Sequence, residues 1–272
     1  MDNSTEPTKP EFYVGYLPTP PAHRRFIQLT VAALTFLTLA LAVLIARAQR
    51  DPGASLIPSA TIQSWTGTLY TQPYPMLIED DGSIHLVMGM GKFGVADRVA
   101  PFKAKRCIVE GWALARSDRQ GIQLAPESNA IRPDPNSTST IAQPALSPPT
   151  PVRLFGEIVD GKCFIGAMKP GDGKAHKSCA ILCIGGGLPP MFESIDPTEF
   201  ESLPLILVNG QAHLPDQLLQ LAGEPVIITA NLQSLGPLPI LNIHFDPWQS
   251  VYPVQRWTPA LAQIAHEPQK QH

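Results

Sequence analysis

Charged and aromatic residues are both scarce in this chain. Aromatic residues make up 7% of the 272 residues, charged residues make up 16%, and the formal net charge is −3. Nucleic-acid binding requires a concentrated basic surface, and single-stranded binding also uses aromatic side chains for base stacking. The composition therefore argues against DNA or RNA as a partner.

Familiar catalytic and cofactor motifs are also missing from the sequence. There is no C-x2-C pair and no C-x2-C-H haem-attachment motif, and Gly89-Met90-Gly91-Lys92 departs from the P-loop pattern. No Ser/His/Asp order and no pair of carboxylates stands out. We therefore predict a non-catalytic protein with no small-molecule substrate and no catalytic residues.

One long apolar segment is present near the N-terminus. Residues 26–46, FIQLTVAALTFLTLALAVLIA, contain no charged residue. About 20 apolar residues in a helix span a bilayer core of roughly 30 Å. The few Gln and Thr residues do not form the single polar face of a buried globular helix. We predict a transmembrane helix, and thus the lipid bilayer as a partner.

The charges around this segment predict its orientation. The triplet His23-Arg24-Arg25 precedes it, while Arg47 and Arg50 follow it, which slightly favours a cytoplasmic N-terminus. Ala46-Arg47-Ala48 matches a cleavage pattern, but the leader and the apolar core are long for a cleaved signal peptide. We predict a single-pass protein of the bacterial inner membrane, with the N-terminus cytoplasmic and the remaining domains periplasmic.

Proline clusters divide the chain into segments. The sequence has 30 prolines, which is typical of tails and linkers between compact pieces. We predict the following segments: a disordered or interfacial tail (1–22), the transmembrane anchor (23–48), a short linker (49–60), a first β-barrel unit (61–125), a Pro/Ser/Thr-rich linker (126–151), a second β-barrel unit (152–248) and a C-terminal tail (249–272). Because Pro-rich linkers are semi-rigid, we expect the two units to sit apart and move relative to one another.

Both soluble units have the sequence pattern of small β-barrels. Short runs rich in β-branched and aromatic residues are separated by Gly, Pro and Asp turns, as in residues 61–70 and 152–160. The two units also share an order of segments, in which Gly67 corresponds to Gly156. This order resembles the OB-fold, a five-stranded barrel with a helix between its third and fourth strands. The predicted fold class is mainly β: one N-terminal transmembrane helix followed by two small OB-like β-barrel units joined by a Pro-rich linker.

An insert in the second unit carries most of the residues with distinctive chemistry. It occupies the place of a hairpin loop and contains the pattern C-x12-H-x2-C-x3-C, formed by Cys163, His176, Cys179 and Cys183. A helix starting at Asp172 or Gly173 and ending at Gly185–Gly187 places the last three within about 60° of one another. Cys163 follows the preceding strand closely enough to fold over that face. Glu157 and Asp160, which flank this strand, are expected to be solvated, as carboxylates usually are.

A metal site is one hypothesis for this insert, with Cys163, His176, Cys179 and Cys183 as ligands. One His and three Cys form a tetrahedral set that zinc prefers in structural sites. Soft thiolates also select Cu(I). A Cys-x3-Cys pair with a nearby His is similar to the ligand sets of copper delivery proteins and of the copper centre of respiratory oxidases. The predicted cofactor is therefore zinc or copper.

Two other hypotheses for the cysteines stay open. Outside the cytoplasm thiols tend to oxidise, so Cys163 can pair with Cys179 or Cys183 in a disulfide worth about 3 kcal/mol. A bond between Cys179 and Cys183 within one helix would be strained and easily reduced, which predicts thiol exchange. Cys107 lies within an apolar strand, and we predict that it is simply buried.

A resemblance extends these predictions to function. The stretch GEIVDGKCFIGAMKPGDGKAHKSCAILCIGGGLPPMF (156–192), with EFYVGYLP (11–18), resembles an uncharacterised group of bacterial single-span membrane proteins. Members of this group accompany membrane-bound oxidoreductases. The resemblance implies an accessory subunit or assembly factor of a redox or respiratory complex, with integral-membrane oxidoreductase subunits as partners. The alternative is a periplasmic thiol-redox or copper-handling protein that uses Cys179, Cys183 and His176.

Overall fold

A computed structural model describes residues 20–48, 55–56, 61–116, 119–195, 203–246, 248 and 254–256. Most of the predicted N-terminal tail, of the 49–60 linker and of the C-terminal tail lies outside these residues. The chain divides into two compact units, residues 1–51 and residues 52–272.

The first unit is represented by a single helix, α1 (Pro21–Ala48). Its segment His23–Arg47 is long and apolar enough to cross a membrane. Large apolar side chains such as Phe26 and Phe36 are exposed along it, at 70% and 75%. An apolar surface on every side of a helix fits a lipid environment better than water, so the predicted apolar span is confirmed by length and composition.

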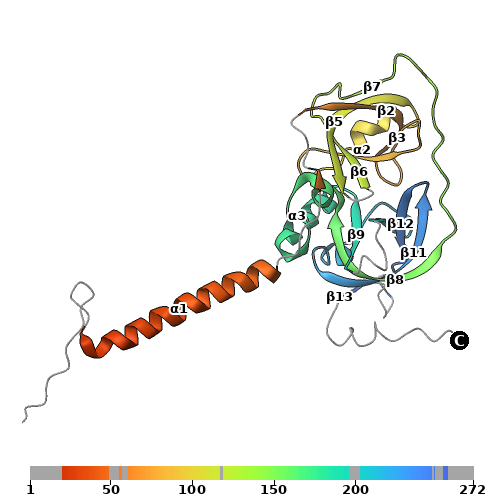
Figure 1. The fold of residues 1–272 in the computed structure, drawn as a ribbon. Helices are drawn as coiled ribbons and strands as arrows, with labels where there is room; N and C mark the ends of the chain where they lie inside the picture. Colours follow the sequence, from red (N-terminus) through yellow and green to blue (C-terminus); the bar gives the residue numbers. More distant parts are fainter. Residues whose placement is uncertain are drawn as a thin grey trace, which may run out of the picture. The chain divides into compact units, whose positions relative to one another are not determined.

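The first barrel is a closed five-stranded sheet (Figure 1). Its strands are β2 (Gln63–Tyr70), β3 (Met76–Ile78), β4 (Ile84–Met88), β5 (Arg106–Arg116) and β6 (Arg119–Leu124). The order is β5-β2-β3-β4-β6, β6 closes on β5, and β4 pairs with β6 in parallel. Two short helices, α2 (Ala96–Val99) and η1 (Ala100–Phe102), lie between the third and fourth strands. The short strands β1 (Ser55–Leu56) and β7 (Ile131–Pro133) add to β5.

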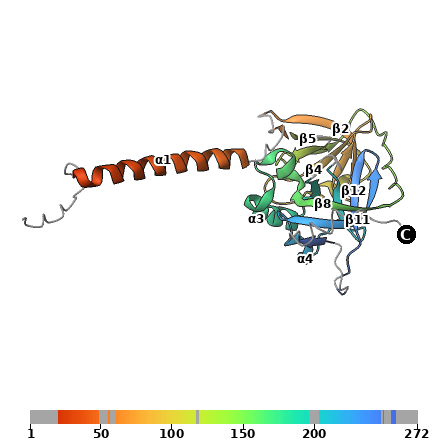
Figure 2. The same ribbon diagram turned by 60° about the horizontal axis from the view of Figure 1, so that its bottom comes forward.

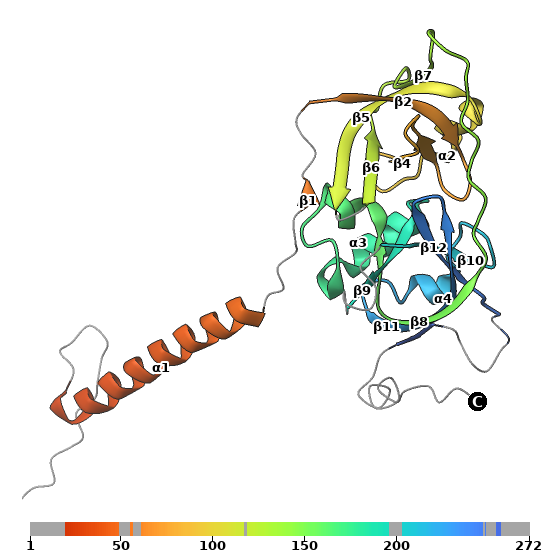
Figure 3. The same cartoon turned by 45° about the vertical axis from the view of Figure 1, so that its right-hand side comes forward.

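The second barrel repeats this topology (Figure 3). Its elements are β8 (Thr150–Asp160), β9 (Pro190–Ser194), β10 (Leu205–Val208), α4 (Asp216–Leu219), β11 (Pro225–Leu235) and β12 (Leu238–Ile243), with β13 (Val254–Arg256) added to β11. Here β12 closes on β11 and runs parallel to β10. Both barrels therefore have the strand order of the OB-fold, as the sequence predicts.

A glycine occupies the same place in the first strand of each barrel. A Cβ atom at Gly67 would lie 2.3 Å from the carbonyl oxygen of Ile78, and one at Gly156 would lie 2.0 Å from that of Glu193. Real Cβ atoms do not approach backbone so closely, so each first strand requires glycine where it meets the second strand. The glycine that the two units have in common therefore has the same steric cause in both.

The two barrels share a hydrophobic core, so the expectation that they sit apart is wrong. One cluster of buried side chains includes Met76 and Met88 from the first barrel together with Leu205 and Ile240 from the second. The Tyr74 hydroxyl also donates a hydrogen bond to the carbonyl oxygen of Ile206, at 3.0 Å. Burial of this phenol raises its pKa, because the charged form loses its hydration.

The predicted linker runs along both barrels instead of separating them. It contributes β7 to the first sheet, and the backbone of Ile141 hydrogen-bonds the side chains of Thr68 and Tyr70. Further along, the amide of Ser147 donates to the carbonyl oxygen of Ser234 on β11, at 2.9 Å. Residues 126–151 therefore pack along the surfaces of both barrels.

The insert lies between the first two strands of the second barrel, as expected. It consists of a short π-helical turn, η2 (Cys163–Ala167), and the helix α3 (Gly173–Gly185). Helix α3 packs beside α4 (Figure 2). The η2 turn contacts β5 and β6 of the first barrel, so the insert reaches the junction between the barrels.

Candidate metal centre

A hydrogen bond to a carboxylate on β8 holds the N-terminus of helix α3. The backbone N–H of Gly173, in the first turn, donates to Glu157 Oε1 at 2.6 Å. A carboxylate satisfies one of the free amides at a helix N-terminus and is favoured there by the helix dipole. The helix ends at Gly185 with Gly186 as its C-cap, as predicted from the glycine run. Glu157 is therefore partly buried at the start of the helix, although the sequence suggests a solvated strand end.

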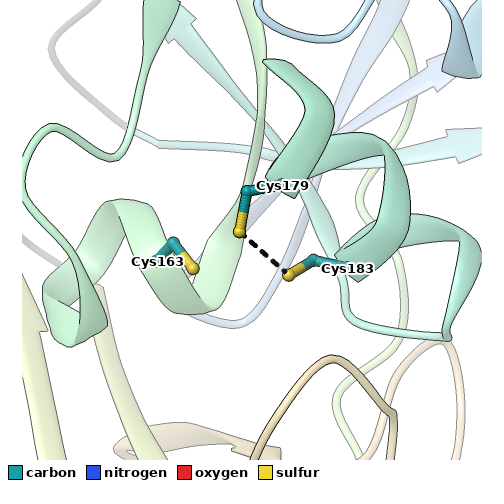
Figure 4. A group of neighbouring side chains, drawn as sticks. All are labelled: Cys163, Cys179 and Cys183. Atoms are coloured by element: carbon teal, nitrogen blue, oxygen red, sulfur yellow. Dashed lines mark hydrogen bonds between the residues drawn. The ribbon is translucent and has the colours of Figure 1, made fainter. Parts of the chain in front are cut away.

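Three thiols converge at the junction between the barrels. The sulfur atoms of Cys163, Cys179 and Cys183 all lie within 4.8 Å of one another. Figure 4 shows Cys163 on the η2 turn, pointing toward Cys179 and Cys183 on successive turns of α3. Cys163 and Cys183 are 4% and 1% exposed, whereas Cys179 is partly exposed. These three side chains, called the thiol cluster below, can hold a metal ion.

His176, predicted as the fourth ligand, takes a different position. Its Nε2 lies 2.8 Å from Asp160 Oδ2, and both side chains are buried. The second oxygen, Asp160 Oδ1, accepts the backbone N–H of Cys163 at 2.9 Å. Asp160, Cys163 and His176 form a second group whose ligand atoms lie within 4.8 Å of one another. The structure thus joins the predicted residues into two groups that share Cys163.

The expectation that Asp160 is solvated is wrong. Its side chain is fully buried, because it accepts hydrogen bonds from both the η2 turn and helix α3. A buried carboxylate is tolerated only when its oxygens are hydrogen-bonded. Asp160 therefore ties the turn that carries Cys163 to the helix that carries the other two thiols.

Two lysines flank the thiol cluster, and each of them extends from one barrel to bind a group on the other. Lys92 extends from the first barrel and donates to Cys179 Sγ at 2.8 Å. Lys162 extends from the second barrel and donates to the carbonyl oxygens of Gly89 and Gly91, at 2.8 and 2.6 Å. Burial lowers the pKa of Lys162, while the hydrogen bond to Cys179 raises the pKa of Lys92. Both cations lie close enough to interact electrostatically with all three sulfur atoms.

The thiols of the cluster are not equivalent. Hydrogen bonding with Cys163 lowers the pKa of Cys183 to about 7, with further help from Cys179 and from the charge of Lys92. The same hydrogen bond, together with burial, raises the pKa of Cys163. Cys183 is therefore the preferred thiolate, and the neighbouring thiol stabilises its charge.

A segment of the first barrel, residues 89–94, forms one wall of the cluster. The amide of Gly94 donates to the carbonyl oxygen of Gly186 at 2.8 Å. A Cβ atom at Gly186 would lie only 1.9 Å from the carbonyl oxygen of Lys92. The glycine run after α3 thus does more than end the helix, because it lets this wall approach and brings Lys92 to Cys179.

A structural disulfide between Cys163 and either Cys179 or Cys183 finds no support in this geometry. All four cysteines lie in the described part of the chain, and each has a free thiol. The sulfur atoms of Cys179 and Cys183 are 3.8 Å apart. Cys107 is buried among the apolar side chains of the first barrel, as predicted, and burial raises its pKa to about 11.

Sequence reasoning missed Asp160, Lys92 and Lys162 as neighbours of the cysteines. Lys162 immediately precedes Cys163 and Asp160 lies three positions before it, and this proximity is a signal that can be found in the sequence. Lys92 is 87 positions from Cys179, and only the packing of one barrel on the other brings the two together.

Comparison of this chain with known proteins found no match. No protein-family model, no curated protein and no solved structure matches this chain. The thiol cluster and the apolar helix are therefore the features from which a function is inferred.

Proposed function

We propose that this chain is a membrane-anchored, non-catalytic accessory protein that binds one Cu(I) ion through Cys163, Cys179 and Cys183. The observation that carries this proposal is the approach of three sulfur atoms to within 4.8 Å of one another. Thiolates select soft ions such as Cu(I) and also bind zinc. Structural zinc sites take four ligands, whereas Cu(I) does not need a fourth. Because His176 is held by Asp160, the three-thiolate set favours Cu(I).

The charges around the cluster support a monovalent ion bound by three thiolates. Such a complex carries a net charge of −2, which is costly to bury without compensation. Lys92 and Lys162 supply two positive charges beside the sulfur atoms. Lys162 is buried, so its charge is little screened by water.

The place of action that we propose is the outer side of the bacterial inner membrane, where the protein serves a redox or respiratory complex. The apolar helix supports attachment to a membrane. The basic triplet before it supports a cytoplasmic N-terminus. The resemblance described above supports oxidoreductase subunits as partners.

Two experiments test the location and the partner. A C-terminal alkaline phosphatase fusion should be active, while a C-terminal fluorescent fusion that requires the cytoplasm should not. After extraction in mild detergent the protein should copurify with a membrane oxidoreductase; a monodisperse protein without a partner would contradict the accessory role.

Metal binding is tested on the full chain, purified in detergent under anaerobic reducing conditions. We expect one Cu(I) per chain in competition with a chromophoric Cu(I) chelator, and weaker retention of zinc. Cys163→Ser, Cys179→Ser and Cys183→Ser should each lower the affinity by at least about 100-fold, which corresponds to roughly 2.7 kcal/mol. Cys107→Ser is the matched control, because this thiol is buried in the first barrel and should leave binding unchanged. Equal binding by the three cluster variants and the control would refute the proposal.

Thiol exchange is a second candidate function, favoured by the 3.8 Å separation of the Cys179 and Cys183 sulfur atoms. Cys179 would attack a protein disulfide, which forms a mixed disulfide and releases one thiolate of the partner. Cys183 would then attack the Cys179 sulfur and release the second thiolate, so that the partner is reduced and this pair is oxidised. Incubation of the full chain with oxidised glutathione distinguishes the two candidates. Rapid, reversible formation of a Cys179–Cys183 disulfide, measured by mass spectrometry, would favour exchange. Stable thiols that still bind Cu(I) would favour the metal site.

A further inference from the structure

The three thiols differ in their access to solvent. Cys163 and Cys183 are almost fully buried, at 4% and 1% exposure, whereas Cys179 is partly exposed. Any ion that enters the site therefore meets Cys179 first. This order of contact makes Cys179 the point of exchange with the surroundings.

The positively charged side chain of Lys92 lies next to Cys179. Lys92 Nζ donates to Cys179 Sγ at 2.8 Å, and the lysine is itself partly exposed. Lys162 has a different position, since it is only 5% exposed and its Nζ binds the carbonyl oxygens of Gly89 and Gly91. Of these two charges, Lys92 is the one that an approaching solute encounters.

The charge of Lys92 indicates what kind of carrier the site accepts. Cu(I) in water is carried on ligands, and a complex with two thiolates has a net charge of −1. A positive charge at the mouth of a site raises the association rate of anions. We infer that the site is loaded from an anionic Cu(I)–thiolate carrier, which Lys92 steers to Cys179. This inference rests on the proposed function.

The transfer is a ligand exchange that leaves copper in the same oxidation state. The Cys179 sulfur forms a bond to Cu(I) as one carrier thiolate leaves, and the departing sulfur takes the proton that Cys179 gives up. Cys183 and Cys163 then each form a bond to Cu(I) as the second carrier thiolate leaves, so that the ion gains a third sulfur ligand. The departing thiolate takes one of the two protons that these thiols release, and the other proton passes to the solvent. No electron changes hands, so no oxidant or reductant is needed.

Exposed apolar side chains near Cys179 bear on the size of the carrier. Phe93 is 71% exposed and Met90 is 48% exposed, on either side of Lys92, while Leu182 on α3 is 58% exposed. A small hydrophilic thiol gains little from such a surface, whereas a carrier protein would bury it. The shared chemistry, an anionic Cu(I)–thiolate, comes either from a low-molecular-weight thiol or from a protein, and the experiment separates the two.

The experiment measures the rate of copper loading into the full-length apoprotein in detergent under anaerobic conditions. The anionic probe is the Cu(I)–glutathione complex, and the cationic probe is the Cu(I)–acetonitrile complex. At an ionic strength of about 0.01 M, where the Debye length is about 30 Å, Lys92→Glu should slow loading from the anionic probe at least tenfold. At about 1 M salt, where the Debye length is about 3 Å, the difference should largely vanish. Loading from the cationic probe should be slowed much less than loading from the anionic probe.

Two matched variants keep the test specific. Lys103→Glu changes an exposed lysine of the same barrel and should load like the wild type. Lys92→Arg keeps the positive charge and should load faster from the anionic probe than Lys92→Glu does. A Lys92→Glu rate equal to that of Lys103→Glu, or an equal slowing with both probes, would overturn the inference. Failure of the wild type to bind copper from either probe would instead overturn the proposed function.

A third arm identifies the source of the ion. Loading is repeated from a Cu(I)-loaded thiolate protein, metallothionein, and compared between the wild type and Phe93→Ser. Slower loading of Phe93→Ser from the protein but not from glutathione supports a protein carrier. Unchanged loading from both sources supports a low-molecular-weight thiol, provided that the Lys92 effect is present.

Discussion

Removal of the Asp160 carboxylate should separate the two halves of the thiol cluster. Asp160 is fully buried and holds two donors: the backbone N–H of Cys163 at 2.9 Å and Nε2 of His176 at 2.8 Å. A buried donor that loses its partner costs about 1–3 kcal/mol. We therefore expect Asp160→Ala to lower the free energy of unfolding by about 2–6 kcal/mol, a large part of the stability of an ordinary domain.

Asp160→Asn should be milder, because it keeps one acceptor in place. The amide oxygen can still accept the N–H of Cys163, and the amide NH2 can donate to the His176 ring in its other tautomer. We expect a loss of about 1 kcal/mol in unfolding free energy for this variant. Since groups behind metal ligands orient them, copper affinity should fall by about 10- to 100-fold in Asp160→Ala and less in Asp160→Asn.

The assay is urea unfolding of the full chain in mild detergent, followed by tryptophan fluorescence, with copper affinity measured in parallel. Asp216→Asn is the control, because Asp216 is an exposed carboxylate of the same barrel and should change stability by at most about 0.5 kcal/mol. If Asp160→Ala unfolds within about 0.5 kcal/mol of this control, Asp160 does not tie the turn to the helix.

Three further predictions concern the barrel junction and the protons of the cluster. Gly186→Ala should destabilise the fold and slow copper binding, because its Cβ would lie 1.9 Å from the Lys92 carbonyl oxygen. Gly185→Ala is the control and should be tolerated, because its Cβ would meet only Leu219, at 3.7 Å. Equal melting temperatures for the two variants would contradict this prediction. Tyr74→Phe should lower the unfolding free energy by about 1 kcal/mol in the same urea assay, since it removes a buried hydrogen bond between the barrels; no change would show that this bond contributes nothing. The pKa of Cys183, lowered to about 7, means that this thiol is a thiolate above that pH and protonated below it. Copper affinity, measured by chelator competition, should therefore lose one additional factor of ten per pH unit below about pH 7, and a constant slope through pH 7 would contradict the assignment.

The sequence predicts the local parts of this structure well. The uncharged apolar run predicts α1, and the alternating β-branched segments with their glycines predict two barrels of OB-type strand order. The glycine run correctly predicts the end of α3 at Gly185. These features depend on residues that are close together in the chain, so they can be predicted from the sequence.

The contacts between the barrels could not be predicted in the same way. The prolines of residues 126–151 suggest a spacer, yet Ile141 and Ser147 make hydrogen bonds to the two barrels. Helical periodicity places His176 on the same face as Cys179, but periodicity does not reveal the buried carboxylate of Asp160 that holds the imidazole. Lys92 reaches the cluster only after one barrel packs on the other.

The common core of the two barrels has a consequence for synthesis. The first barrel leaves the ribosome while the second is still being translated, and its apolar side chains Met76, Met88 and Leu114 then have no counterpart to cover them. Such transiently exposed surface promotes aggregation, so nascent chains of this protein should depend on chaperones until residue 243, the end of the last barrel strand, has emerged.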